Sequence, residues 1–325
     1  MSPDPLASLL SCRLLLVTGK GGVGKTTLAC ALARAAADRG VETVVVDLAP
    51  GSDIARLLCK RPESLPPGDG RTPVALGRHL SGLTIDPRTA LQEYLEIELH
   101  FRPLASLVVS NPALRTLLDA APGWRDLITL GKLWHLTTLA RSDGVPRWPL
   151  LVVDAPSTGY GLSFISVPLA VADAVRVGPV ARHTRALREL LCDRERTRVL
   201  PVTLPEELPV RETELLHHKL RELRMAAGPT LANAVESLPP LPSSERLARA
   251  LSRAPSPAAL PWLSWDQVEP AIAHVKHRVA LQAHYLKQLE GAREPVLSLP
   301  FLARGISGPD EIAELAATLE EGRTR

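Results

Sequence analysis

The chain has 325 residues and a formal net charge of +3 at pH 7, with 38 Lys and Arg residues against 35 Asp and Glu residues. Hydrophobic residues make up 45% and charged residues 22%, proportions that exclude a disordered chain or a bundle of membrane-spanning helices. So small a charge excess gives no broad basic field for gripping DNA or RNA, and no nucleic-acid partner is expected. The length suits one large α/β domain or two smaller ones.

The cysteines and the N-terminus indicate the compartment. Cys12, Cys30, Cys59 and Cys192 are widely separated and include no C-x-x-C pair. Reduced thiols are therefore expected, rather than a thiolate metal cage or a disulfide-rich secreted fold. The first ten residues lack the pattern of a secretion signal, and no run of about 18 apolar residues follows. We expect a cytoplasmic protein without stable membrane insertion.

The first half of the chain begins with a strand, a helix and a second strand. Residues 13–18 form an apolar run that ends in glycines, residues 26–39 have a helical pattern, and residues 41–47 are rich in β-branched side chains. This succession predicts two parallel strands joined by a helix. Residues 60–77 are dense in Pro and Gly and predict an exposed loop. Residues 88–140 repeat apolar side chains at helical spacing, which predicts a helical insertion without a strand.

The second half of the chain returns to strands. Further strands are expected at 149–154, 197–203, 230–235 and 295–300, with long helices at 211–224, 266–290 and 309–321. These elements predict an α/β fold with a mostly parallel central sheet flanked by helices, plus the helical insertion. We expect residues 1–325 to form a single domain of this kind, with 88–140 as a candidate client-binding subdomain.

A phosphate-binding loop follows the first predicted strand. Residues 19–27, GKGGVGKTT, match G-x-x-x-x-G-K-[ST] between a strand and a helix, the context that the motif requires. The backbone N–H groups of such a loop surround phosphate oxygens, Lys25 reaches the terminal phosphates, and the Thr26 hydroxyl can ligate Mg²⁺. ATP and Mg²⁺ are the expected cofactors, and the binding loop comprises Gly21, Gly22, Val23, Gly24, Lys25, Thr26 and Thr27.

Lys20 adds a second lysine inside the loop, as K-G-G-x-G-K-[ST]. With this deviant Walker A pattern the sequence resembles the P-loop ATPases that include the arsenite-pump ATPase and the tail-anchored-protein targeting factor. In that family the extra lysine reaches across a dimer interface to the partner's phosphates, so the resemblance implies a catalytic role for Lys20 in a nucleotide-sandwich dimer. The alternative is a solvated loop lysine. The expected partner is a second copy or a paralogous ATPase.

Residues 154–164, DAPSTGYGLSF, resemble the second switch of this branch. Asp154 ends a predicted strand, where its carboxylate can hold Mg²⁺ through water, and the Gly159 backbone N–H could sense the γ-phosphate. An ordinary strand-end cap is the alternative for Asp154. Two details depart from the branch: Pro156 lies one place early, and Tyr160 stands where the branch usually has His.

Residues 47–53, DLAPGSD, occupy the place of the first switch. The superfamily's water-positioning Asp aligns with Ala49, and alanine cannot orient or deprotonate water. Asp53 is the best substitute as a catalytic residue, although Asp47 and Asp53 are equally consistent with structural roles at a strand end and a helix cap. Hydrolysis is therefore predicted to be slow.

Two further segments extend the resemblance. Asn233 matches an adenine-reading asparagine of the branch, with a strand-end turn as the alternative. Residues 121–134 are similar to a region that couples nucleotide state to client binding, although Asp126 replaces the branch's Glu. The apolar side chains of this segment suit either a client surface or the core. They are Trp124, Leu127, Ile128, Leu130, Leu133 and Trp134.

The leading functional prediction is a dimeric ATPase that couples nucleotide state to a helical client or partner surface. The alternative is a weakly hydrolysing regulatory subunit of an ATPase heterodimer, which Ala49 favours. A membrane-positioning ATPase is disfavoured because the C-terminal helical segment is acidic and lacks a basic amphipathic face. Arsenite is disfavoured as a substrate because no clustered thiols occur, and a zinc-bridged dimer is disfavoured because C-x-x-C is absent.

Overall fold

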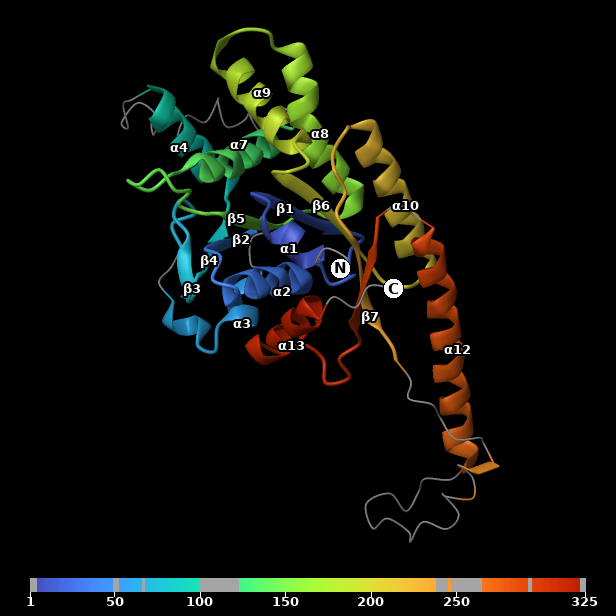
Figure 1. Cartoon of the computed structure of the whole chain (residues 1–325). Helices are drawn as coiled ribbons and strands as arrows, with labels where there is room; N and C mark the ends of the chain where they lie inside the picture. Colours follow the sequence, from blue (N-terminus) through green and yellow to red (C-terminus); the bar gives the residue numbers. More distant parts are fainter. Residues whose placement is uncertain are drawn as a thin grey trace.

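The computed structural model describes residues 5–48, 53–65, 68–99, 123–237, 245, 246, 249, 265–291 and 294–321. They form an eight-stranded sheet with the strand order β3-β4-β2-β5-β1-β6-β7-β8 (Figure 1). All neighbouring strands run parallel except β3 and β4, which make an antiparallel hairpin at one edge. The strands are β1 (Leu14–Gly19), β2 (Thr43–Asp47), β3 (Val74–Gly77), β4 (Leu80–Thr84), β5 (Leu150–Asp154), β6 (Thr197–Thr203), β7 (Thr230–Val235) and β8 (Val296–Pro300).

The central strands are buried on both faces because their runs are almost continuously apolar. Leu15 and Val17 of β1 belong to one core cluster, whereas Leu14 and Leu16 belong to the other. The same alternation divides β2 and β5 between the two clusters. A parallel strand covered by helices on both faces needs apolar residues on both of its faces. This continuous apolar composition is why the strands could be predicted from the sequence.

Short or alanine-rich helices cover one face of the sheet. The nine buried residues of α2 include six alanines, which allow the helix to lie close to its neighbours. Pro309 and the Glu311 carboxylate, which accepts the Gly308 N–H at 2.9 Å, start the last helix, α13. The helices on this face are α1 (Pro5–Leu10), α2 (Lys25–Asp38), α3 (Ile54–Leu58) and α13 (Pro309–Glu320), and a 3₁₀ helix, η1 (Pro62–Ser64), follows α3.

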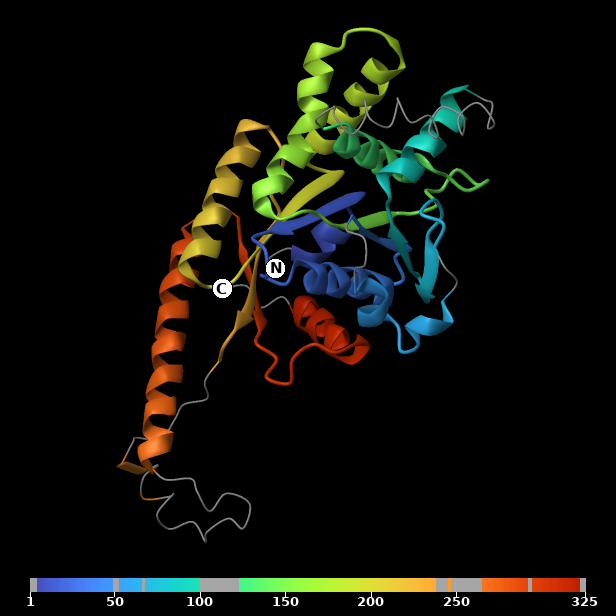
Figure 2. The ribbon, with the colours of Figure 1, turned by 180° about the vertical axis from the view of Figure 1, so that it is seen from behind.

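A second helical layer covers the other face, as the two opposite views show (Figures 1 and 2). The helices α4, α7, α8 and α9 gather beyond the sheet, whereas α10 and α12 lie beside β7 and β8. The N-terminal part of α12 extends away from the sheet. These helices are α4 (Pro87–Leu99), α7 (Trp124–Thr138), α8 (Thr158–Ala174), α9 (Gly178–Cys192), α10 (Glu207–Glu222) and α12 (Trp265–Glu290).

Most predicted elements are confirmed, and the expected α/β fold with a mostly parallel sheet is present. The prediction of a loop throughout 60–77 is wrong, because η1 and β3 lie within it. β3 was not predicted because it is an edge strand of only four residues that follows a Pro- and Gly-rich stretch, and so short a run shows no strand pattern of its own. The expected helical insertion corresponds to α4 and α7 in its described part, and residues 100–122 lie outside the described residues. No helix in the described ranges is both long and apolar enough to cross a membrane.

Candidate functional site

The phosphate loop joins the central strand β1 to the N-terminus of α2. Gly22 and Gly24 have φ angles of 85° and 93°, in the left-handed region that favours glycine. Gly24 is the N-cap of α2, and a Cβ built on it would lie 2.3 Å from Nδ2 of Asn233. Glycine is therefore required at position 24 for both backbone conformation and space. The loop directs the first N–H groups of α2 and the positive end of its dipole outward, where an anion can bind.

Lys25 and Thr26 occupy the first turn of α2. The Lys25 Nζ donates to the Lys20 carbonyl oxygen at 3.2 Å, so the side chain folds over the loop. Burial lowers the pKa of Lys25, and Asp154 opposes this shift. The Thr26 hydroxyl donates to a carboxylate oxygen of Asp154 at the end of β5. The structure thus brings the two parts of the predicted metal site together.

Asp154 and Asp47 end adjacent parallel strands at matching register positions. Asp47 is almost completely buried, and the other Asp154 oxygen, Oδ1, is buried without a hydrogen-bond partner in the described part of the chain. Burial raises the pKa of Asp154, and the Asp47 charge adds to the increase. A cation beside these oxygens would remove the cost of burying their charge.

This site fits Mg²⁺ bound together with a nucleotide. Thr26 supplies a hydroxyl and Asp154 an oxygen without a partner, both of the hard oxygen type that Mg²⁺ prefers. No cluster of three or more His, Cys, Asp or Glu side chains that could hold a metal occurs among the described residues. Phosphate and water oxygens would therefore complete the coordination, as is usual for Mg²⁺ at phosphate loops.

Lys20 forms an ion pair with a residue of its own chain. Its Nζ lies 3.9 Å from Oε1 of Glu212 on α10, and Oε2 of Glu212 accepts a hydrogen bond from the Thr158 hydroxyl at 2.5 Å. Glu212 therefore contacts both the phosphate loop and the first residue of α8. Sequence reasoning did not single out Glu212. The contact with Lys20 spans 192 positions and left no local signal.

The segment predicted to be the second switch, residues 154–164, connects the loop to the helical region. The Thr18 hydroxyl donates to the Pro156 carbonyl at 2.7 Å, which holds the switch against β1. Gly159 is the second residue of α8, so its N–H belongs to the first turn, where N–H groups lack helical acceptors. The Tyr160 hydroxyl donates to Oδ1 of Asp126 on α7 at 2.7 Å. Tyr160 and Asp126, which both depart from the branch's pattern, are thus bonded to each other.

The segment predicted to be the first switch, residues 47–53, is only partly described by the structure. Ala49 lies outside the described residues. Asp53 precedes α3, and its exposed carboxylate pairs with Arg56 at 3.0 Å, which lowers the pKa of Asp53. Its described contacts are therefore local, and its catalytic role stays a prediction.

Asn233 reaches the loop from β7. Its Nδ2 donates to the Val23 carbonyl oxygen at 2.9 Å, and the residue is only 9% exposed. The structure therefore places this predicted binding residue against the phosphate loop. Adenine recognition by Asn233 stays a prediction.

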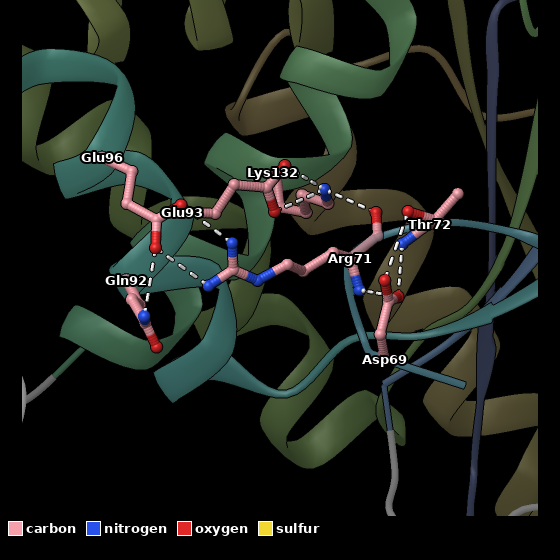
Figure 3. A network of polar contacts seen from close by, with 7 residues as sticks. All are labelled: Asp69, Arg71, Thr72, Gln92, Glu93, Glu96 and Lys132. Carbon is pink, nitrogen blue, oxygen red and sulfur yellow. Dashed lines mark hydrogen bonds and ion pairs between the residues drawn. The ribbon is translucent and has the colours of Figure 1, made fainter. Parts of the chain in front are cut away.

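A polar network fixes the helical region to the sheet edge (Figure 3). Lys132 of α7 is buried and donates to both carboxylate oxygens of Glu93 on α4 at 2.6 Å, and to the Arg71 carbonyl at 2.9 Å. The Arg71 guanidinium makes two hydrogen bonds to Glu96, at 2.8 and 3.1 Å. The Asp69 carboxylate accepts hydrogen bonds from the backbone N–H groups of Arg71 and Thr72, in the turn that leads into β3. Sequence reasoning missed this network because its members come from three separate segments.

The apolar side chains of α7 divide between core and cavity. Leu130 and Leu133 are completely buried, as the core alternative predicted. Leu127, Ile128 and Trp134 are half-buried and line a cavity of about 110 Å³ between α4, α7 and α9.

These features define a class of protein. A phosphate loop after the central strand of a parallel sheet, with a strand-end aspartate bonded to its threonine, is the arrangement of a P-loop nucleoside triphosphatase.

Comparison with known proteins identifies the family within this class. The chain belongs to the anion-transporting ATPase family, whose sequence profile matches residues 12–178. It is 30% identical to the ATPase BagA of Mycobacterium tuberculosis over 310 residues, 92% of this chain and 90% of that protein. It is 26% identical to an arsenical pump-driving ATPase of Escherichia coli over 279 residues, 80% of this chain and 43% of that protein. The resemblance to the arsenite-pump ATPases is confirmed, and the chain is an ATPase of this family.

Proposed function

We propose that this chain binds and hydrolyses Mg²⁺-ATP as part of a dimer, and that the bound nucleotide changes the helical region through the second switch. The partner is a second copy or a paralogous ATPase. The client or partner surface lies on α4 and α7 within the insertion. Family membership supports the ATPase chemistry, the Thr26–Asp154 contact supports Mg²⁺ binding, and the Tyr160–Asp126 contact supports the coupling. The dimer is supported by the second lysine of the loop, Lys20, through the resemblance.

The residues around the loop have distinct roles in this proposal. Backbone N–H groups from Gly21 to Thr27 surround the phosphates, and Lys25 leaves the Lys20 carbonyl to pair with the terminal phosphates. Thr26 and Asp154 would hold Mg²⁺, which neutralises phosphate charge when bound. The Gly159 N–H donates to the γ-phosphate, so α8 senses whether that phosphate is present.

The hydrogen bond between Tyr160 and Asp126 is the observation that carries the coupling. Tyr160 directly follows the proposed γ-phosphate sensor, and Asp126 lies in the first turn of α7. Asp126 is buried, so its carboxylate depends on hydrogen bonds from the protein. A shift of α8 on nucleotide binding therefore changes a contact that α7 needs.

Dimerisation gives Lys20 its role. In the isolated chain Lys20 faces Glu212, and both side chains are about one-third exposed. An ion pair this open to water is weak, so the phosphates of a partner's nucleotide can compete for the lysine. Asp53 is the proposed substitute for the first-switch carboxylate, and Asn233 contributes to nucleotide binding.

Hydrogen exchange tests the coupling directly. We expect Mg²⁺-ATPγS to change amide exchange in residues 124–138 of the wild-type protein. Lys25→Ala is the control, since it should abolish nucleotide binding measured by calorimetry and the exchange change with it. Binding of ATPγS to the wild type without any change in α7 would refute the coupling, and unchanged affinity in Lys25→Ala would refute the loop assignment.

Ala49 favours a second candidate, a weakly hydrolysing regulatory subunit of an ATPase heterodimer. The sequence has no carboxylate at this first-switch position, and water orientation is a main part of phosphoryl-transfer catalysis. The test is purification from the native host with ATP, followed by identification of the subunits that co-purify. A paralogous ATPase in stoichiometric amount supports the heterodimer, whereas a homodimer with fast turnover excludes it.

A further inference from the structure

The end of β7 carries an extra residue. From Ala232 to Val235 β7 advances three positions, whereas its partner β8 advances two, from Ser298 to Pro300. Ala234 in this bulge has φ = 53°, in the left-handed region that non-glycine residues disfavour. Such a conformation persists only where surrounding contacts hold it, and it is concentrated at functional sites.

The bulge directs Asn233 at the phosphate loop. The Asn233 amide nitrogen donates to the Val23 carbonyl at 2.9 Å and lies where a Gly24 side chain would be. The phosphate-binding conformation needs N–H groups to converge on the anion, and a carbonyl turned inward would repel it. A hydrogen bond that holds the Val23 carbonyl toward Asn233 therefore fixes the loop in its anion-binding shape.

Helix α12 in turn holds the bulge. Gln282 is buried on the face of α12 that carries the buried Leu286 and Leu289. Its Oε1 accepts the Glu236 N–H at 2.9 Å, and its Nε2 lies 3.5 Å from the Ala234 carbonyl oxygen. A buried amide in an apolar face is costly unless its polar atoms are bonded, and both of these partners are backbone groups at the bulge. Arg278, one turn earlier, pairs with Glu236 at 2.7 Å.

We propose that Asn233 and Gln282 are positioning residues for phosphate binding. Gln282 fixes the bulge, the bulge orients Asn233, and Asn233 holds the Val23 carbonyl. The hydrogen bond from Asn233 to Val23 thus serves the triphosphate, whichever base is attached. This inference rests on the proposed nucleotide binding at the loop, and it connects α12, whose place in the fold Figure 1 shows, to that loop through β7.

Inorganic tripolyphosphate separates this role from adenine recognition because it has no base. Calorimetry with Mg²⁺-ATP and with Mg²⁺-tripolyphosphate would compare the wild type with Asn233→Ala and Gln282→Met. Methionine keeps the volume of glutamine and removes both hydrogen bonds. Since either variant affects the ligand only through the one hydrogen bond from Asn233 to Val23, we expect both ligands to bind about three- to tenfold more weakly to either variant.

Two controls sharpen the result. Gln288→Met alters the same helix at an exposed glutamine that bonds Glu214, and it should bind both ligands like the wild type. The double variant Asn233→Ala/Gln282→Met should bind no more weakly than Asn233→Ala alone, since both act through one contact. Calorimetric stoichiometry counts the folded molecules, so a folding defect is separated from a change in affinity.

Two results would overturn this proposal, and a third would overturn the proposed function. If Asn233→Ala weakens ATP binding and leaves tripolyphosphate binding unchanged, Asn233 reads the base and the proposal is wrong. If Gln282→Met binds both ligands like the wild type, or the two substitutions add fully, α12 does not act through Asn233. If the wild type binds neither ligand, the proposed function fails instead.

Discussion

Replacing Tyr160 by Phe removes one hydroxyl that joins the second switch to α7. The hydroxyl donates to Oδ1 of Asp126 at 2.7 Å, and this bond raises the pKa of Tyr160 to about 12. Asp126 is only 6% exposed, whereas Tyr160 is 52% exposed. A hydrogen bond to a charged group contributes about 1.5–3 kcal/mol, and water can partly replace the exposed hydroxyl, so we expect a loss of about 1.5 kcal/mol.

That free energy sets the largest effect on nucleotide binding. If the bond exists in only one nucleotide state, Tyr160→Phe shifts the affinity for Mg²⁺-ATPγS by up to about tenfold, because 1.4 kcal/mol corresponds to a factor of ten. If the bond is equally strong in both states, only stability changes.

A double-mutant cycle measures the bond. Urea unfolding of Tyr160→Phe, Asp126→Asn and the double variant, each with and without Mg²⁺-ATPγS, gives the coupling energy in both states. Tyr94→Phe is the matched control, since its hydroxyl contacts His183 at 3.4 Å in the same helical region and does not touch the switch. Fully additive effects would refute the bond, and an unchanged nucleotide response of α7 in Tyr160→Phe would refute its role in coupling.

Three further predictions follow from the loop and the core. Lys20→Ala should leave the ATP affinity of the isolated protomer nearly intact and reduce dimer-dependent turnover. A loss of affinity as large as that of Lys25→Ala would contradict the role of Lys20 at the partner's phosphates. Single-turnover hydrolysis should be slow in the wild type and faster in Ala49→Asp, and fast wild-type turnover would show that another group orients water. Burial lowers the pKa of His217, although the charge of Glu294 acts in the opposite direction. Below about pH 6.5 the unfolded chain therefore binds a proton at this imidazole more readily than the folded chain does, and the free energy of unfolding should fall as the pH decreases. His217→Gln should flatten this dependence by at most about 1.4 kcal/mol per pH unit in urea unfolding, whereas the exposed neighbour His218→Gln should keep the wild-type slope.

The sequence was sufficient for the parts of the site that are contiguous. The loop from Gly19 to Thr27 carries its whole chemistry in nine positions, and Asp154 ends a strand whose apolar run is unmistakable. Asn233 was found only through resemblance, and its contact with Val23 requires the fold because 210 positions separate them. Glu212 is similar, since nothing near it in the sequence indicates that it faces a loop lysine.

The sequence was least informative at the sheet edge. Pro and Gly between residues 60 and 77 correctly signal turns, but β3 is stabilised by its pairing with β4 and by the Arg71 network, neither of which has a local pattern. Local propensity therefore indicated a loop where tertiary contacts form a strand.

The strand order also sets when the site can form during synthesis. β1 and β2 are consecutive in the chain, yet they are separated in the sheet by β5, which pairs with both. A nascent chain that ends before Leu150 therefore has a phosphate loop with no neighbouring strand on either side, since β6 comes later still. Pairings at such long sequence separation form slowly, and in the meantime both edges of β1 and one edge of β2 stay unpaired, while β4 can already cover the other edge of β2. The central strand, which carries the phosphate loop, is therefore open to wrong strand pairing until β5 has been synthesised.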